Sequence, residues 1–339
     1  MAITSTTLEI PSSNKTLIFD SPSRTLHIEP SRPVPTPDQS KNEHLIRVQT
    51  TALCKGELEW PVMFPDAIFS ENPEKLITPG YDLAGTVITA PMGSPFHPGD
   101  DIYARTLPSR PGNYRGHSIA RTAEMALKPQ ALTWAQAASV PLSALSAWQA
   151  LFEHAGMQGL RDPSPTTKKI LVIAAAGGVG VWLVQFAKLA GLEVVAQIGG
   201  AENDRFIREL GASETVNYRQ TSLKEWAATN GPVDVVFDCL GGKTLEDAWY
   251  CIKDDGSLIS IVEPPEGRRP AELIASKAKS EFFIMRPDGH QLAEISKLLD
   301  EGQCRAVVDS VWGFEDYEKA FGRLNDGHAR GKVVIKVSD

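Results

Sequence analysis

Residues 169–191, which read KILVIAAAGGVGVWLVQFAKLAG, decide the fold of this chain. A short apolar run meets three glycines, Gly177, Gly178 and Gly180, and a longer apolar run follows them. The lengths of the two runs indicate a buried strand followed by a helix. Glycines at such a turn allow the backbone to approach a pyrophosphate, and the start of the helix supplies N–H donors. The stretch therefore predicts a dinucleotide-binding unit, with Ala174 where the usual pattern has its first glycine.

Two other interpretations of this stretch stay open. Residues 170–187 carry no charge and come close to the roughly 20 residues that cross a bilayer. The glycines near the middle of this run and Lys188 at its end argue against a membrane helix. The same glycines would equally suit a close helix–strand contact that binds no ligand.

The composition favours a soluble protein with two domains. A length of 339 residues suffices for two separate cores, and a formal net charge of −8 argues against nucleic acid or an anionic membrane as partner. Four widely spaced cysteines without a C-x-x-C pair suggest neither a disulfide framework nor a cysteine-rich zinc site. The first fifteen residues have neither a basic start nor an apolar core, so we expect no secretory signal and a cytoplasmic protein.

The pattern of elements changes near residue 134. Short strands and turns before it predict a β-rich lobe, and Thr133 and Ser143 are candidate helix N-caps. Strands alternate with helices after it, which predicts an α/β unit with a parallel sheet and right-handed crossovers. The expected strands are 16–20, 25–29, 45–52, 83–89, 102–104, 170–175, 193–197, 214–218, 233–238, 257–262, 281–285 and 332–337. The expected helices are 134–138, 144–154, 179–190, 204–210, 244–252, 291–301 and 314–324.

The end of the second strand of a dinucleotide fold selects the cofactor. An acid there binds the ribose of NAD, whereas a cation accommodates the 2′-phosphate of NADP. Residues 193–197 lead into a segment without an acid at that end, and Arg205 lies just beyond. We therefore expect NADP(H), with Arg205 as the phosphate clamp. The alternative is an exposed Arg205 that pairs with Glu209 one helical turn later.

A series of motifs then resembles a known family. They are PGYDLAG (79–85), PGD (98–100), AASVPL (137–142), AAAGGVG (174–180), GA (211–212), VVFD (235–238) and GKVV (331–334). In order and spacing they resemble the medium-chain dehydrogenase/reductase superfamily, in its zinc-independent quinone-oxidoreductase-like branch. The segment GELEWP (56–61) is similar to an NADP-dependent subgroup of that branch.

The resemblance implies an architecture and an oligomer. It implies a GroES-like β-rich catalytic domain over residues 1–135, completed by 288–339, and a Rossmann-type doubly wound parallel sheet over 136–287. Members of the family often form a homodimer through the edge strand of the cofactor sheet, here 281–285, whose apolar sequence EFFIM would invite pairing.

The resemblance also implies the residues of the site. The implied substrate pocket contains Cys54, Glu57 and Trp60. The implied cofactor contacts are Ala176, Gly177, Gly178, Val179, Gly180, Gly200, Arg205, Tyr218, Leu240, Val262 and Lys332.

The zinc ligands of related alcohol dehydrogenases are incomplete here. Cys54 matches the first ligand position, but Tyr81 and Asp82 stand where those enzymes have histidine and glutamate. Gly56 replaces the hydroxyl that relays the alcohol proton. Because a catalytic zinc needs three protein ligands, we expect no metal.

The activity implied is hydride transfer from NADPH to an activated acceptor, the C=C bond of an enone or a quinone, followed by protonation. Water or a tyrosine would supply the proton, and Tyr81 and Tyr114 are the candidates. Either tyrosine would equally suit a packing role, with its hydroxyl bound to a backbone carbonyl. The partner is then a small molecule. The alternatives are a carbonyl or imine reductase of one biosynthetic metabolite and a non-catalytic NADPH-binding protein.

Overall fold

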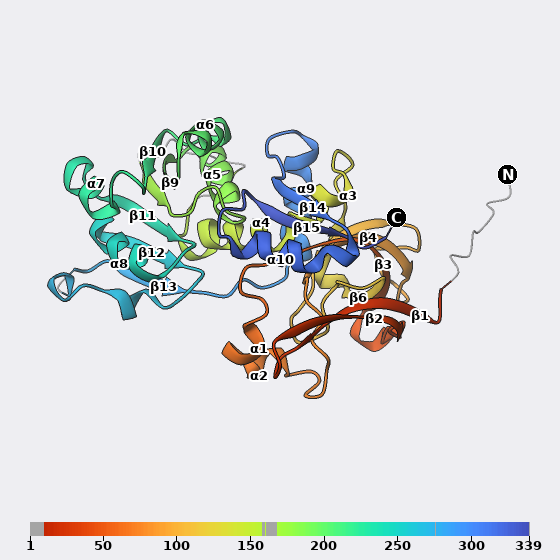
Figure 1. Ribbon diagram of the computed structural model, residues 1–339. Helices are drawn as coiled ribbons and strands as arrows, with labels where there is room; N and C mark the ends of the chain where they lie inside the picture. Colours follow the sequence, from red (N-terminus) through yellow and green to blue (C-terminus); the bar gives the residue numbers. More distant parts are fainter. Residues whose placement is uncertain (1–9, 158–159, 161–167, 275, 339) are drawn as a thin grey trace.

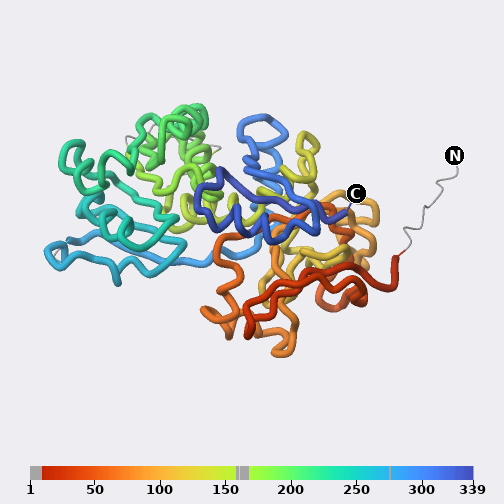
Figure 2. Tube along the Cα trace, viewed as in Figure 1, coloured from red at the N-terminus to blue at the C-terminus, as the bar shows by residue number. Residues whose placement is uncertain are grey.

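The computed structural model describes residues 10–157, 160, 168–274 and 276–338. Residues 1–9, part of the stretch read above for a secretory signal, lie outside this range. Two lobes lie side by side (Figure 1). The chain builds most of the first lobe, crosses to the second, and returns to the first, so the C-terminal segment drawn in blue lies against both (Figure 2).

The secondary structure follows the chain in this order. The strands of the first lobe are β1 (Ser13–Asp20), β2 (Thr25–Pro33), β3 (Glu43–Ala52), β4 (Asp82–Thr89), β5 (Asp101–Arg105), β6 (His117–Arg121), β7 (Met125–Leu127), β14 (Val308–Trp312) and β15 (Lys332–Lys336). Those of the second lobe are β8 (Lys169–Val172), β9 (Glu193–Ile198), β10 (Glu214–Asn217), β11 (Val233–Asp238), β12 (Ile252–Ser260) and β13 (Lys279–Phe282). The α-helices are α1 (Trp60–Met63), α2 (Pro65–Ile68), α3 (Trp134–Ala138), α4 (Pro141–Trp148), α5 (Gly180–Leu189), α6 (Ala201–Leu210), α7 (Leu223–Asn230), α8 (Gly242–Ala248), α9 (Gly289–Asp300) and α10 (Tyr317–Asn325), and a π-helix (Gln149–His154) extends α4.

The second lobe is the predicted doubly wound parallel sheet. Its six strands lie in the order β10-β9-β8-β11-β12-β13, so the strand order reverses between β8 and β11. Ile170 and Val172 face one buried cluster and Leu171 and Ile173 the other, because successive side chains of a strand point to opposite faces. Helices cover both faces, which explains why the strand reads as continuously apolar. The α/β class is confirmed.

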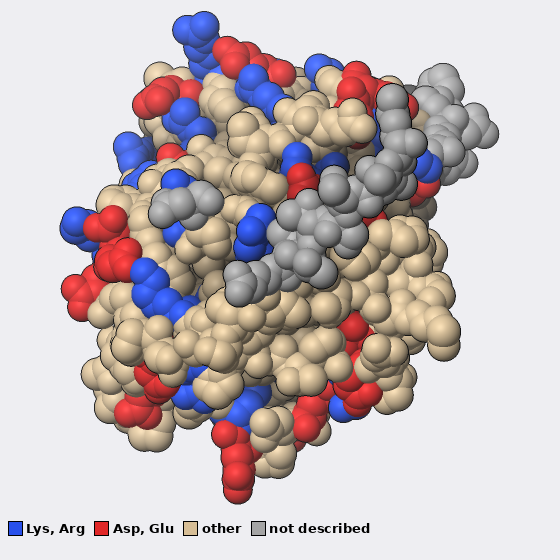
Figure 3. Space-filling model, turned by 90° about the vertical axis from the view of Figure 1, so that its right-hand side faces the viewer, with Lys and Arg blue, Asp and Glu red and all other residues tan. Residues whose placement is uncertain are grey.

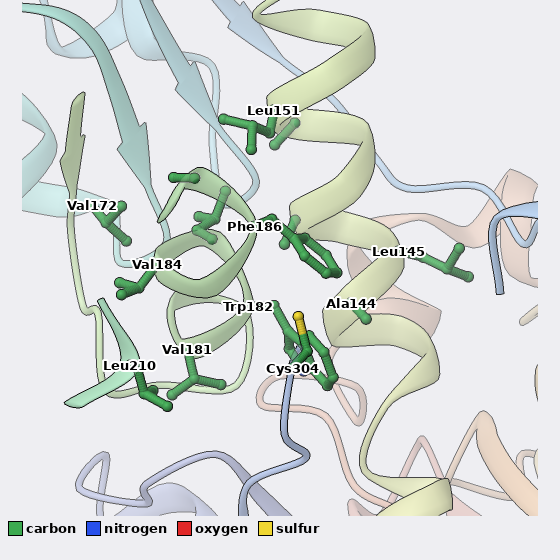
Figure 4. Close-up of a cluster of buried hydrophobic side chains, with 14 of the residues drawn as sticks. Ala144, Leu145, Leu151, Val172, Val181, Trp182, Val184, Phe186, Leu210 and Cys304 are labelled. Carbon is green, nitrogen blue, oxygen red and sulfur yellow. The ribbon is translucent and has the colours of Figure 1, made fainter. Parts of the chain in front are cut away.

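Helix α5 anchors one of these two cores. Figure 4 shows Trp182 and Phe186 pointing from α5 toward the continuous helix formed by α4 and the π-helix. The ring of Phe186 meets the ring of Trp148 edge-on, with 5.6 Å between centroids. The apolar run after the glycines is therefore a buried helix of ten residues. In the part of the chain that is described, no helix has both the length and the apolar character to cross a bilayer.

The first lobe is completed by the end of the chain. Its main sheet has the order β14-β15-β3-β4-β5-β7, with β6 also paired to β3. Strand β15 pairs antiparallel with β3, Val334 opposite Ala52, which supplies the partner that the last predicted strand lacked. Gly331, directly before β15, also bridges to Gly177 and donates its N–H to the Ala176 carbonyl at 3.0 Å. The glycine loop and the last strand are therefore in direct contact.

Several boundaries differ from the expected ones. Pro141 opens α4, so Ser143 lies inside the helix and does not cap it. Strand β13 is Lys279–Phe282, because the chain turns back toward the first lobe soon after it pairs with β12. Helix α7 was missed, although Ser222 forms a capping box at its start. The expected domain boundary at 135/136 falls inside α3, which packs against β3 and β4.

The surface carries mixed charges on the face drawn in Figure 3. Lys and Arg side chains alternate there with Asp and Glu, and no broad basic patch is visible among the coloured atoms.

We expect Gly180→Ala to destabilise the fold. A Cβ at Gly180 would lie 2.5 Å from the Ala174 carbonyl oxygen and 2.6 Å from the Ala175 Cα, so the backbone must shift at a cost of about 1–3 kcal/mol. The matched control is Gly322→Ala in α10, where a Cβ meets no atom within 4 Å. That change should stabilise the protein by about 0.5–1 kcal/mol. Urea unfolding measures both, and equal effects would contradict the close approach.

Candidate active site

The glycine loop forms the floor of the site at the carboxyl ends of β8 and β11. A Cβ at Gly178 would come within 3.0 Å of the Ser143 Oγ and 3.2 Å of the Lys332 Cδ. The Ser143 hydroxyl is buried and has no hydrogen-bond partner among the described residues. The glycine loop, α4 and β15 thus come together at the start of α5, where the glycine backbone and the unpaired Ser143 hydroxyl can contact a ligand. This arrangement suits the pyrophosphate and nicotinamide half of a dinucleotide.

Asp238 shapes the neighbouring turn. Its carboxylate accepts the N–H groups of Leu240 and Gly241 at 3.1 and 3.0 Å, and the Ser260 hydroxyl donates to it at 2.7 Å. These bonds hold Leu240 at the end of β11 and Val262 just after β12, with 49% and 39% of their surfaces exposed. Both lie where the resemblance placed cofactor contacts.

A second group of residues surrounds the start of α6. Gly200 precedes this helix, and a Cβ on Gly199 would overlap the ring of Tyr218. Two arginines lie here. The Arg219 guanidinium lies 5.8 Å from the ring centroid of Tyr218, and the Arg330 Nε donates to the Asn203 Oδ1 at 3.0 Å.

Arg205 does not belong to this group. Its side chain is 87% exposed and pairs with Glu209 at 3.1 Å, as in the alternative interpretation. The physical reason is that α6 begins at Ala201, which places Arg205 more than one turn inside the helix and within reach of Glu209. Arg219 could have been found from the sequence, because it directly follows Tyr218. No local pattern points to Arg330, which approaches from the far end of the chain.

The predicted pocket residues gather between the lobes. Glu57 is buried, and its two carboxylate oxygens accept the N–H groups of Cys54 at 3.1 Å and Gly80 at 3.0 Å. Burial raises the pKa of Glu57 to about 7, although the two N–H donors and nearby cations oppose this shift. The carboxyl therefore fixes the loop after β3 to the segment before β4.

A buried ion pair crosses the centre of the site. The Lys332 Nζ lies 3.1 Å from the Asp82 Oδ2, and less than a tenth of either side chain is exposed. The Asp82 Oδ1 accepts the Leu142 N–H at 2.8 Å. Burial lowers the pKa of Lys332, but Asp82, Cys54 and Glu57 together outweigh it and the net pKa is raised, so the ammonium stays charged. The pair joins β4, α4 and β15.

The two candidate tyrosines lie in different surroundings. The ring of Tyr81 stacks on Trp60 at 5.6 Å between centroids, and its hydroxyl makes no hydrogen bond to any described residue. Burial raises the pKa of Tyr81, so its hydroxyl keeps its proton. Tyr114 instead lies in the core of the first lobe and donates to the Phe314 carbonyl at 2.9 Å. The segment around Tyr114 is thus packed into the lobe, and Tyr114 has the packing role given above as the alternative.

The residues around Cys54 do not fit a catalytic zinc. The Lys332 ammonium pairs with one oxygen of Asp82, and the Leu142 N–H binds the other. Burial raises the pKa of the Cys54 thiol to about 11, which keeps it protonated. Within the described ranges, no group of three or more His, Cys, Asp or Glu side chains is arranged to hold a metal. We therefore derive no step through a metal.

The chain has clear relatives. A profile described as a zinc-binding dehydrogenase matches residues 210–335. The chain is 45% identical over 331 residues to a "probable zinc-binding oxidoreductase, mitochondrial" of Arthroderma benhamiae, covering 97% of this chain and 98% of that one. It is 30% identical over 283 residues to a human mitochondrial NAD(P)H oxidoreductase, covering 77% and 70%. The structure of a quinone oxidoreductase from Coxiella burnetii matches with a TM-score of 0.82 at 25% identity, covering 96% and 100%.

The expected cytoplasmic location is wrong in the light of these relatives. Both protein sequences just cited are named as mitochondrial. The sequence argument rested on the lack of a secretory pattern, and a secretory pattern says nothing about organellar import.

We expect the buried ion pair to contribute strongly to stability. Asp82→Asn keeps an oxygen for the Leu142 N–H but removes the charge, and Lys332→Met removes the partner. Each single variant leaves an unpaired buried charge and should lower the free energy of unfolding by about 3–5 kcal/mol. The double variant should lose less than the sum of the two, because no lone charge remains.

The control for this double-mutant cycle is the exposed pair Lys319–Asp316, whose charged atoms are 2.8 Å apart. Removing it should leave chemical unfolding unchanged. Additive losses at Asp82 and Lys332 would contradict a coupled pair.

Proposed function

The chain belongs to the zinc-binding dehydrogenase family of the medium-chain dehydrogenase/reductase superfamily and is a nicotinamide-dependent oxidoreductase, and from this membership we propose a zinc-independent NADPH-dependent reductase of activated acceptors. The acceptors are enones, enoyl C=C bonds or quinones. The Lys332–Asp82 ion pair carries this proposal, because an ammonium pairs with the carboxylate that stands in place of the glutamate in the zinc motif of related alcohol dehydrogenases. An acceptor that is already electron-poor needs orientation and electrostatic stabilisation more than a Lewis acid.

Each residue of the site has its own role in this reaction. When bound, the nicotinamide supplies the hydride. Gly177 and Gly178 present backbone to the pyrophosphate, and Ser143 and Lys332 fix the position of the ring end. The positive charge of Lys332 stabilises negative charge that develops on the acceptor oxygen. Tyr81 holds its proton at the hydroxyl, free of other partners, and donates it to the reduced acceptor.

The homodimer expectation also stays a proposal. Strand β13 is the edge of the cofactor sheet, and Ile284 just after it is 65% exposed. Phe283, in contrast, is buried in the protomer, so less of the EFFIM segment is available for pairing than its sequence indicated.

The test of the activity is oxidation of NADPH with four acceptor classes: a quinone, an enone, an aldehyde and an imine. We expect quinone and enone turnover to exceed the other two by about tenfold or more, and Tyr81→Phe to lower kcat about tenfold to a hundredfold, as removal of a general acid does. The matched control is Tyr114→Phe, which should leave kcat unchanged. Faster aldehyde or imine turnover would favour the carbonyl or imine reductase. NADPH binding without turnover of any acceptor would favour the non-catalytic alternative.

The preference for NADPH should depend on Arg330 and not on Arg205. Arg330 lies at the start of α6, where its guanidinium binds Asn203 and pairs with the exposed Glu202 at 3.0 Å. A 2′-phosphate would take the place of that carboxylate. Arg330→Ala should weaken NADPH binding about ten- to a hundredfold while NADH binding changes little. Fluorescence titration measures the binding of both cofactors. The control is Arg205→Ala, which removes the same charge. A loss of preference in Arg205→Ala alone would overturn this assignment.

A further inference from the structure

Arg105 is a buried cation inside the pocket cluster. It ends β5, opposite Asp82 of β4 in the sheet, and only 4% of its surface is exposed. No carboxylate of the described chain lies within 4.0 Å of its guanidinium. Its Nη1 donates to the Thr106 carbonyl, and its Nε is buried without an acceptor. The edge of the guanidinium is therefore short of anionic partners.

Aromatic rings satisfy only the faces of this guanidinium. Its carbon atom lies 5.2 Å from the ring centroid of Tyr81 and 5.7 Å from that of Trp60. Cation–π contacts of this kind recover part of the desolvation cost of a buried ion, but they do not replace hydrogen bonds to its N–H groups. Elsewhere in the same lobe, Arg110, whose side chain is 11% exposed, is paired with both oxygens of Glu124 at 2.7 and 2.6 Å.

The two acids nearest to Arg105 are already engaged. Asp82 pairs with Lys332 and accepts the Leu142 N–H. Glu57 uses both oxygens for backbone N–H groups and forms no ion pair with Arg105. Burial also favours the neutral form of Glu57. Neither acid therefore offers a carboxylate oxygen to the Arg105 guanidinium.

We propose that Arg105 binds a carboxylate of the substrate, so that the acceptors of this enzyme are electron-poor C=C compounds that carry a carboxylate. The assignment rests on the proposed reductase function and narrows its substrate class. A guanidinium binds a carboxylate through two parallel hydrogen bonds, which also fixes the orientation of the reacting double bond relative to Tyr81.

Trp60 controls access to this residue. It is the first residue of α1, a helix of only four residues whose Val62 and Met63 are 64% and 58% exposed. Its ring lies over one face of the Arg105 guanidinium and against Tyr81. A carboxylate reaches the edge of Arg105 when the Trp60 ring moves outward with this short helix.

The probes are trans-4-oxo-2-pentenoate and its methyl ester, which share one enone skeleton and differ in charge. The quantity measured with NADPH is the ratio of kcat/KM for the acid to kcat/KM for the ester. We expect this ratio to be about tenfold or more higher in the wild-type protein than in Arg105→Met. Arg105→Lys keeps the charge without the planar fork and should retain part of this ratio. Comparing ratios between variants removes the intrinsic reactivity difference of acid and ester.

The control is Arg115→Met, with Arg115→Lys if the first variant does not fold. Arg115 is also a buried arginine without a carboxylate partner in the described structure, but it lies beside β1, where it bridges to Thr16. Its variants should keep the wild-type acid-to-ester ratio. An equal ratio in wild-type and Arg105→Met, or an equal loss in the Arg115 variants, overturns the proposal.

Binding separates this proposal from the proposed function. Calorimetric titration of the protein with trans-4-oxo-2-pentenoate, in the presence of NADP⁺, needs no turnover. Binding that Arg105→Met weakens about tenfold or more supports the carboxylate site even if no acceptor is reduced, in which case only the reductase function fails. If quinones are reduced but the acid binds equally well to wild-type and Arg105→Met, the reductase function stands. The carboxylate site is then overturned.

Discussion

The ion pair between Lys332 and Asp82 is the interaction on which the arrangement of this protein depends. Both groups are withdrawn from water, so their attraction offsets a large desolvation cost only if the geometry is good. The geometry is good because the second Asp82 oxygen binds the Leu142 N–H. One carboxylate therefore holds the start of β4, the start of α4 and the returning strand β15 together. The stem of Lys332 lies against Gly178, so the same contact sets the distance between the catalytic lobe and the glycine loop.

The chemistry of the site follows from how its charges are distributed around this pair. Lys332 and Asp82 neutralise each other, and Glu57 is occupied with backbone N–H groups, so its role is to hold a loop in place. Arg105 contributes a guanidinium that forms no ion pair with a described carboxylate and lies next to the stacked rings of Trp60 and Tyr81. The pocket is thus built from aromatic faces and cations, which suits acceptors that become more negative as they are reduced. A thiol with a raised pKa and a carboxylate bound by ammonium leave no ligand set for a metal.

The two ends of the cofactor site are specified in different ways. The pyrophosphate turn is local, because Gly180 must allow α5 to approach the end of β8 and Ala174 takes a left-handed φ of 56° to make the turn. The adenosine end is assembled from separate segments. Tyr218 and Arg219 follow β10, and Arg330 arrives from the C-terminal segment to meet Asn203 in α6. The sequence position pointed to Arg205, which the structure leaves exposed and paired with Glu209, whereas Arg330 comes from a distant segment to the start of α6.

Sequence patterns predicted the strand–turn–helix unit, the alternation of strands and helices, the N-cap at Thr133 and the class of fold. These features depend on hydrophobic periodicity and on turn and cap residues within a few positions of each other, which are visible along the chain. The family's motifs predicted a pocket with Cys54, Glu57 and Trp60, and that assignment stays a prediction. The tertiary structure was needed to show that β15 pairs with β3. It also shows that, among the described residues, Ser143 has no hydrogen-bond partner and Arg105 has no carboxylate partner, while Arg110 has one. Each of these depends on which side chains from distant segments come within hydrogen-bonding distance, and no local pattern encodes that distance.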